Sequence, residues 1–181
     1  MPAEPSPDVT SPTGTGPAKA DLGAGSTRRV GRLFAEYAES HRNPINLLIH
    51  WLAVPVIYWT VLALLSALPF PTGWRIIPGL DWGAVTAVVA VLYVLTLSIP
   101  LAVAMAAFSV TGLVLAAAYS RWGEVPLWQF ALFVFVFAWI LQLIGHKIEG
   151  RKPSFYRDQQ FLLIGPLWLL AKLFRLFGLK Y

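Results

Sequence analysis

All three histidines of the chain, His41, His50 and His146, are predicted to lie at one membrane–water boundary. His41 and His50 flank the start of the first long apolar segment, and His146 lies near the end of the last comparable one. Histidine is the commonest metal ligand in proteins, so this grouping suggests a metal site. Because the chain has no cysteine, any metal must be bound by nitrogen and oxygen donors.

Polar residues accompany the first two histidines at helical spacing. Asn43 followed by Pro44 is a favourable N-cap and first-turn pair, so a helix is predicted to begin there and to leave His41 just outside. His41 is then able to fold back over the helix start. Asn46 and His50 are four residues apart and share a face of this helix.

The second cluster lies at the end of the last apolar segment. Spacings of four and three residues place Gln142, His146 and Glu149 on one helix face. Gly145 lets another backbone or a ligand approach closely. Two helix ends from opposite parts of the chain thus present imidazole, amide and carboxylate groups at a similar depth.

Each of these residues also has a simpler interpretation. A single histidine at a membrane interface is usually an amphipathic side chain resting among the lipid headgroups. Glu149 could pair with Lys152 or Arg42, and Asn46 and Gln142 could form interhelical hydrogen bonds in lipid. The joint placement of the groups favours the metal site, because ionisable residues within spans are costly and generally functional.

The elements that position these groups follow from composition. Hydrophobic residues make up 57% of the chain and charged residues 13%, which is far from the average of soluble domains and indicates a membrane protein. Four apolar segments can each cross a hydrocarbon core, which takes roughly 17 to 25 helical residues. We therefore predict an all-α, polytopic membrane four-helix bundle with a C-terminal interfacial helix. The spans cover about 45–68, 82–99, 101–119 and 126–145.

The two middle spans are almost continuous in sequence. The stretch 82–119 contains no formal charge and is about twice the length that one helix needs. Ser98-Ile99-Pro100 falls at its centre and predicts a tight turn between two spans. The alternative is one long, kinked and tilted helix, but tilt alone does not absorb so much excess length.

Positive charge predicts the orientation of the spans. Five of the fourteen Lys and Arg residues precede the first span and seven follow the fourth, whereas only Arg75 and Arg121 lie in the outer connections. Positive residues mark the cytoplasmic side, so both termini are predicted to be cytoplasmic. We predict that the membrane is a bacterial inner membrane, or the endoplasmic reticulum if the source is eukaryotic. Juxtamembrane cations beside membrane lipids explain the pI of about 9.7 without nucleic acid.

The two ends of the chain differ from its middle. Residues 1–30 form a Pro-, Gly-, Ser- and Thr-rich tail that is predicted to be disordered, and 31–181 form a single membrane domain. An interfacial helix is predicted at about 166–177, with Trp168, Lys172 and Arg175 facing water. A fifth span is the alternative there, but it would place two cations inside the membrane.

The two histidine clusters resemble the 2-hydroxy fatty acid dioxygenase family, a small membrane family once catalogued as a domain of unknown function. The motifs that carry the resemblance are His41-x2-Pro44-x-Asn46-x3-His50-x4-Pro55 and Gly145-His146-x2-Glu149-x3-Pro153. They fit in order and spacing across four hydrophobic segments, and the likeness extends over roughly 34–177.

The resemblance implies an iron(II)-dependent dioxygenase that shortens a 2-hydroxy fatty acid by one carbon and releases carbon dioxide. His41, His50 and His146 are then the iron ligands, with Glu149 as an alternative ligand or as a group that orients one. Three protein ligands leave three octahedral positions for a chelating 2-hydroxy acid and O2. Asn46 and Gln142 are expected to position imidazoles or bound oxygen. Three cations are expected to bind the substrate carboxylate: Arg42, Lys147 and Arg151.

Two other classes of function remain open at this stage. A bis-histidine haem protein could use His50 and His146 for electron transfer. A lipid-binding or scaffold protein without catalytic activity would need none of the histidines. The di-iron hydroxylases and desaturases are excluded, because their histidine boxes require many more than three histidines. The sequence also leaves homo-oligomerisation open.

Overall fold

The computed structural model describes residues 29–74, 77–151 and 161–181, and within these ranges the chain is all-helical, as predicted. A short 3-10 turn, Thr72–Trp74, lies between the second and third helices. The helices are α1 (Arg29–Ala38), α2 (Pro44–Ser66), α3 (Trp82–Leu95), α4 (Ile99–Trp122), α5 (Leu127–Glu149) and α6 (Phe161–Leu176).

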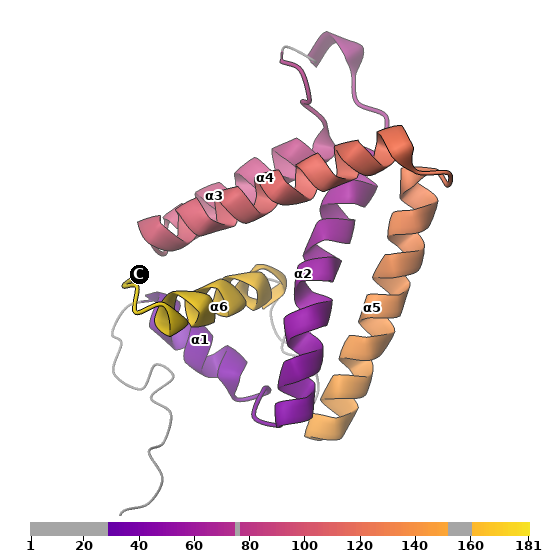
Figure 1. Ribbon diagram of the computed structural model, residues 1–181. Coiled ribbons are helices and arrows are strands. Elements are labelled where there is room, and N and C mark those ends of the chain that lie inside the picture. Colours follow the sequence, from indigo (N-terminus) through magenta and orange to yellow (C-terminus); the bar gives the residue numbers. More distant parts are fainter. Residues whose placement is uncertain (1–28, 75–76, 152–160) are drawn as a thin grey trace, which may run out of the picture.

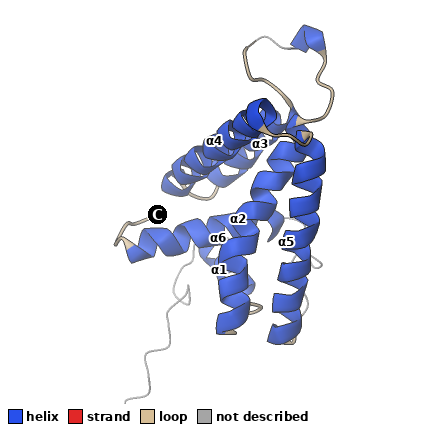
Figure 2. Ribbon diagram, turned by 45° about the vertical axis from the view of Figure 1, so that its right-hand side comes forward, coloured by secondary structure: helices blue, strands red, loops and turns tan. Residues whose placement is uncertain are grey.

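Two pairs of helices form the frame of the molecule (Figures 1 and 2). α2 packs along α5, and α3 packs along α4, with the second pair crossing the end of the first pair. α1 and α6 contact each other and lie in the corner between α2 and α4. The main core lies where these elements meet, around fully buried side chains such as Phe34, Leu62, Met105 and Leu167.

Three of the four predicted spans are long enough to cross a membrane, namely α2, α4 and α5. The span predicted at 82–99 is wrong in length, because α3 has 14 residues and ends at Leu95. The hydroxyl of Thr96 donates to the Tyr93 carbonyl at 2.7 Å, and Ser98 caps the next helix. These local hydrogen bonds compete with continued helix, so residues 96–98 form the connection.

The turn at Ser98-Ile99-Pro100 is confirmed, and the alternative of one long kinked helix is wrong. Ser98 is extended (φ −165°, ψ 126°), and its side chain accepts from the amide of Leu101. Pro100 lies in the first turn of α4, where its missing amide proton costs nothing. The chain therefore reverses direction between α3 and α4.

The C-terminal helix differs from its prediction. α6 begins at Phe161 and runs through Pro166. Trp168, which was expected to face water, is only 2% exposed, because α6 packs against α1, α2 and α4. Helix α1 was not predicted at all. Its buried face, which includes Val30, Leu33 and Phe34, packs against α6.

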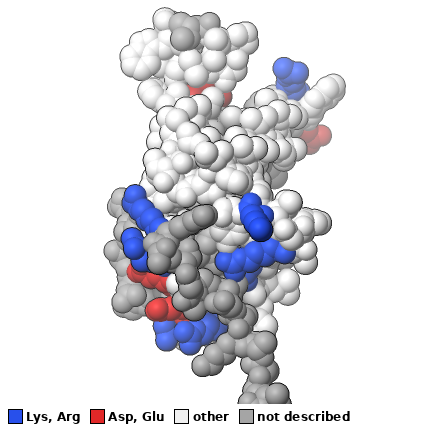
Figure 3. Space-filling model, turned by 90° about the vertical axis from the view of Figure 1, so that its left-hand side faces the viewer, with Lys and Arg blue, Asp and Glu red and all other residues white. Residues whose placement is uncertain are grey.

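Charge is unevenly distributed over the surface. In the view of Figure 3, Lys and Arg gather over the lower part of the molecule, and a broad uncharged region separates them from a few charged side chains near the top. Such a pattern is typical of a protein with one cationic end beside an apolar belt. Residues 1–28 of the predicted disordered tail lie outside the described residues, as does Lys152, so the predictions for them are not tested. Arg29 and Val30, the last two residues of that predicted tail, instead begin α1.

Candidate metal centre

The start of α2 is fixed by its cap. The side chain of Asn43 accepts hydrogen bonds from the amides of Ile45 and Asn46, and Pro44 occupies the first turn, as predicted. This arrangement leaves His41 in the connection from α1 and places His50 almost two turns inside α2. His146 comes from the last turn of α5, which packs against α2.

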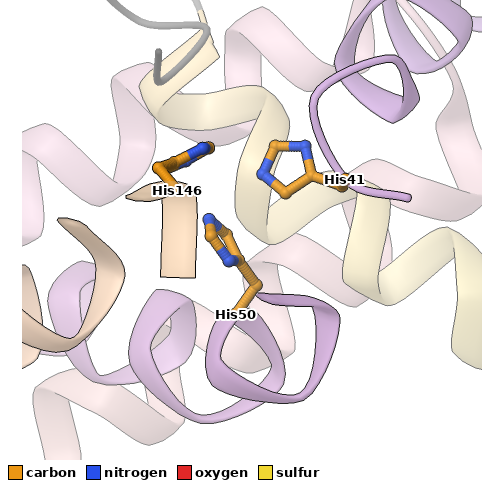
Figure 4. A group of neighbouring side chains, drawn as sticks. All are labelled: His41, His50 and His146. Carbon is orange, nitrogen blue, oxygen red and sulfur yellow. The ribbon is translucent and has the colours of Figure 1, made fainter. Parts of the chain in front are cut away.

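The three histidine rings converge on one point (Figure 4). The ring centroids lie 4.3 Å apart for His41 and His50, 4.8 Å for His50 and His146, and 5.1 Å for His41 and His146. The rings are nearly perpendicular to one another, and all three are buried, with exposed fractions of 5% or less. The structure thus brings together three residues that are up to about a hundred positions apart in sequence.

One nitrogen of each ring is bound to the backbone. Nδ1 of His41 donates to the Tyr37 carbonyl at 2.7 Å, and Nδ1 of His50 donates to the Asn46 carbonyl at 2.9 Å. The ring of His146 hydrogen-bonds to the backbone of Arg151. Such bonds fix the tautomer and the orientation of an imidazole, and metal-binding histidines almost always make them.

The other nitrogen of each ring has no hydrogen-bond partner among the described residues. These atoms are Nε2 of His41, Nε2 of His50 and Nδ1 of His146, and all three are buried. Buried polar atoms are normally paired, so three unpaired nitrogens in one place call for an explanation. One ring nitrogen from each histidine lies within 4.8 Å of the others, and a small inward rotation would give typical metal–nitrogen distances of about 2.1 Å. The three residues therefore fit a metal ion.

Burial also keeps His41 in the protonation state that a metal requires. Removal from water, followed by the nearby His50, lowers the pKa of His41 to about 3. His41 is therefore neutral at pH 7, and its lone pair is available to a cation. The Tyr37 ring stacks on it with centroids 4.0 Å apart and an interplanar angle of 13°.

Glu149 joins the end of α5 to the start of α2. Its two carboxylate oxygens accept from the backbone amides of Arg42 at 2.9 Å and Asn43 at 2.8 Å, and from the side-chain amide of Asn46 at 3.1 Å. A carboxylate is favoured at this place because it faces the positive end of the α2 dipole. Glu149 thereby holds the segment that carries His41, and its geometry favours an orienting role over that of a ligand.

Gly145 and Asn46 allow α2 and α5 to approach at the level of the histidines. A Cβ atom on Gly145 would overlap Oδ1 of Asn46. Asn46 is completely buried, and its amide nitrogen donates to the Ser40 carbonyl at 3.2 Å as well as to Glu149. The predicted close approach at Gly145 is confirmed, and Asn46 links His50, the His41 loop and α5.

Gln142 lies one turn before His146 on the same face of α5, as predicted. It is 8% exposed, and its Oε1 has no hydrogen-bond partner among the described residues. Gln142, His146 and His41 all line a cavity of about 470 Å³. The amide therefore faces a space that a ligand can enter beside the histidines.

The three cations that were expected to bind a carboxylate lie elsewhere. The side chains of Arg42, Lys147 and Arg151 are exposed, and none of them lines the cavity. The backbones of Arg42 and Arg151 contribute instead, through Glu149 and His146. The role of their side chains in substrate binding stays a prediction.

Tyr37 and Trp168 were not predicted to belong to the site. The Tyr37 ring stacks on His41, its backbone carbonyl accepts a hydrogen bond from Nδ1 of His41, and the Trp168 ring lies 5.8 Å from the ring of His41. The spacing of Tyr37 and His41 is four residues, the same as that of Asn46 and His50. This repeated spacing was the available clue, because in a helical turn it brings a histidine ring to the carbonyl four residues earlier.

Comparison with known proteins gives one match. The family model described as 2-hydroxy-palmitic acid dioxygenase Mpo1-like matches residues 27–176. No curated protein and no solved structure matches the chain. Because the family model covers most of the sequence, including all three histidines, the chain belongs to this family.

Proposed function

We propose that this protein, a member of the 2-hydroxy-palmitic acid dioxygenase Mpo1-like family, is an iron(II)-dependent membrane dioxygenase. It would shorten 2-hydroxy fatty acids by one carbon. The observation that carries the proposal is the set of three buried, unpaired histidine nitrogens that face one another. It supports a metal-dependent activity, and the family description supports the substrate class.

His41, His50 and His146 would hold the iron. The metal, when bound, would supply the redox chemistry that couples oxidation of the hydroxyl-bearing carbon to the reduction of dioxygen. The reaction balances without any other reductant, because a 2-hydroxy acid and O2 give the acid one carbon shorter, CO2 and water. Neither 2-oxoglutarate nor an external electron donor is needed.

The other residues of the site orient these groups and receive the substrate. Glu149 and Asn46 fix the His41 loop against α2, and the backbone bonds fix the ring tautomers. Oε1 of Gln142 is a buried acceptor beside the histidines and would accept the hydrogen bond of the substrate 2-hydroxyl. Exclusion of water from this buried site strengthens each of these polar interactions.

The site lies where a fatty acid is presented by a membrane. α2 and α5 are long and apolar enough to span the bilayer, and the histidines lie at the start of one and the end of the other. A substrate carboxylate at the headgroup level would meet the metal, and the tail would lie among apolar helices. We further propose that this end of the molecule is cytoplasmic, because most of the cations flank it.

The alternative of a bis-histidine haem protein is poorly supported by the geometry. A haem must pass between its two axial histidines, whereas the rings of His50 and His146 are nearly perpendicular, with centroids only 4.8 Å apart. His41 closes a third side, since its centroid lies 4.3 Å from that of His50. A single ion fits this space and a macrocycle does not.

The decisive experiment combines metal analysis with turnover. The purified full-length protein in lipid nanodiscs is expected to contain iron close to one equivalent and no Soret band. It should also convert a 2-hydroxy fatty acid with equal amounts of O2 consumed and CO2 released. His146→Ala should lose both the iron and the turnover.

Thr60→Ala is the matched control, because Thr60 is fully buried in α2 and, among the described residues, hydrogen-bonds only to the Ile57 carbonyl of its own helix. It should keep both properties. A wild-type protein that is folded but has no metal, or a His146→Ala variant that turns over substrate normally, would refute the proposal. A metal-free protein that still binds lipid would support the scaffold alternative.

A further inference from the structure

The cavity beside the histidines extends along the groove between α2 and α5. On α2 it is lined by Val54, Ile57 and Val61, which recur at spacings of three and four and so share one face. On α5 it is lined by Phe135 and Trp139, in register with Gln142 and His146 at the same kind of spacing. The first turns of α6 close the side of the groove with residues such as Leu163 and Pro166.

Polar and apolar lining residues are separated along this cavity. His41, His146 and Gln142 lie at one end, and the walls beyond them are mainly aliphatic and aromatic. Gln142 is nine-tenths buried, and its unpaired Oε1 lies at the polar end. A ligand that fits both parts has a polar head and a long apolar tail, which is the form of a 2-hydroxy fatty acid.

The length of the cavity follows from helix geometry. His146 and Phe135 are eleven residues apart, so the lining face of α5 spans about 16 Å at 1.5 Å per residue. An extended hydrocarbon tail with C–C bonds of about 1.5 Å advances roughly 1.25 Å per carbon, so about 13 methylenes fit along this face. The same distance is about half of a 30 Å hydrocarbon core.

The end of the groove is bounded by the second helix pair. α3 crosses α2 there, and it contributes Thr86 to the lining (Figure 1). Gly83 of α3 lies so close to α2 that a Cβ atom on it would meet the Leu62 carbonyl oxygen. A straight tail running from the histidines therefore reaches the crossing helix beside Val61.

We propose that this cavity binds the acyl tail of the substrate, and that Val61, Thr86 and Phe135 at its far end set the longest tail that is accepted. This inference rests on the proposed function and adds the limit of specificity, at about 16 carbon atoms in the whole acid when the two head carbons and the terminal methyl are added to the 13 methylenes. The tail would keep the depth and direction that it has in the bilayer.

Selectivity at this cavity depends on shape. A tail that leaves hydrocarbon for an apolar protein groove gains little from the transfer itself, because lipid is as apolar as the lining side chains. A tail that is too long must bend out of the groove or displace packed side chains. Val61, Thr86 and Phe135 are thus specificity-determining residues, and their substitution should leave the metal site intact.

The test is the chain-length profile of turnover in a mixture of 2-hydroxy acids with 8 to 20 carbons, a probe set chosen to bracket a tail of about 13 methylenes. Val61→Trp should lower kcat/KM for a 16-carbon acid relative to a 10-carbon acid by about tenfold or more, because the indole fills space that only the longer tail needs. Phe135→Ala should shift the preference toward longer acids. Iron content should equal that of the wild type in both variants.

Matched controls exist on the lipid-facing side of α5. Val136 is 48% exposed and Phe137 is 56% exposed, and neither lines the cavity. Val136→Trp and Phe137→Ala should leave the profile unchanged. If Val61→Trp and Val136→Trp give the same profile while turnover persists, the inference fails and the proposed function stands. If no variant and no wild-type protein turns over any 2-hydroxy acid, the proposed function fails first.

A binding measurement tests the same inference without turnover. Trp139 lies seven residues from His146, about 10 Å along α5, so a 2-hydroxy acid brominated near about carbon 10 would place its bromine beside the indole. Under anaerobic conditions this probe should quench tryptophan fluorescence in the wild type and do so less in Trp139→Phe. Equal quenching in the two proteins would show that the tail binds elsewhere, as a non-specific membrane lipid would.

Discussion

The two ends of α2 both bring polar groups from different helices together, but only one end leaves them unpaired. At the C-terminal end, Oδ1 of Asp81 accepts from the hydroxyl of Ser66 at 3.0 Å and from the amide of Ala84 at 2.8 Å. At the N-terminal end, His41, His50 and His146 leave three ring nitrogens without a partner. Polar residues alone therefore do not mark the site. Unpaired ring nitrogens that lie close together do mark it.

Both ends also use a glycine where helices cross closely. Gly83 lets α3 approach α2 at Ser66, and Gly145 lets α5 approach α2 at Asn46. At the first crossing Ser66 donates a hydrogen bond to Asp81, and beside the second crossing lie the three histidines that could hold a metal ion. A glycine allows the close approach at both crossings, so matched substitutions of Gly83 and Gly145 can separate effects on stability from effects on metal binding.

The largest expected effect is that of His50→Ala. Removing one of the three proposed ligands should reduce bound iron and turnover to background, because the two remaining imidazoles cannot hold the ion against competing water. Metal analysis by mass spectrometry and oxygen uptake measure this loss. Retention of one equivalent of iron in the variant would show that His50 is not a ligand.

The two glycines separate the two ends more sharply. Gly145→Ala should push Asn46 and α2 away from α5, lower the iron content and destabilise the fold by about 1–3 kcal/mol. Gly83→Ala should destabilise the fold by a similar amount and keep its iron, because its contact lies at the other end. Thermal unfolding and iron content measured on both variants give the comparison, and equal loss of iron from both would contradict it.

Glu149 and Asp81, the carboxylates at the two ends of α2, should differ less in their effect on metal binding. Glu149→Gln keeps a similar shape but removes the charge and one acceptor, so the three donors that it now binds cannot all be satisfied. Metal affinity should fall about 10- to 100-fold, as is typical when an orienting group is lost. Asp81→Asn should leave metal affinity unchanged. Competition with a calibrated chelator measures both, and an unaltered affinity in Glu149→Gln would exclude the orienting role.

The smallest effect belongs to Ser66→Ala. It removes one hydrogen bond to Asp81, which keeps its second donor at Ala84. A loss of about 0.5–1.5 kcal/mol in unfolding free energy is expected, with normal iron content and turnover. A lower iron content in this variant would mean that the two ends of α2 are coupled. That result would contradict the expectation that only the N-terminal end of α2 affects metal binding.

Much of the frame could be predicted from local sequence. Asn43-Pro44 begins α2, and Ser98 with Pro100 begins α4, because capping and proline chemistry act within a few residues. The length of α3 could not be predicted in the same way. The apolar pattern continues to Ile99 and so predicts a longer helix. The hydroxyl of Thr96 hydrogen-bonds locally and takes part in ending the helix at Leu95.

The buried surfaces of α1 and α6 lay beyond such reasoning. The helical spacing predicted a water-facing stripe made of Trp168, Lys172 and Arg175. Trp168 is instead buried, and its ring lies against those of Tyr37 and His41. Lys172 places its ammonium group over the Trp168 ring, 3.8 Å from the centroid. The spacing of residue types shows which side chains share a helix face. Which face is buried depends on the helices that pack against it.

By itself, the sequence determined the long apolar helices, the starts of α2 and α4 and the identity of the three histidines, since composition, caps and spacing are local properties. Only the tertiary structure decided that the three rings meet, that each has one nitrogen bonded to backbone and that the others remain unpaired. The physical reason is that His41 and His146 are brought together by the packing of α5 against α2 and by the Glu149 bonds to residues more than a hundred positions away.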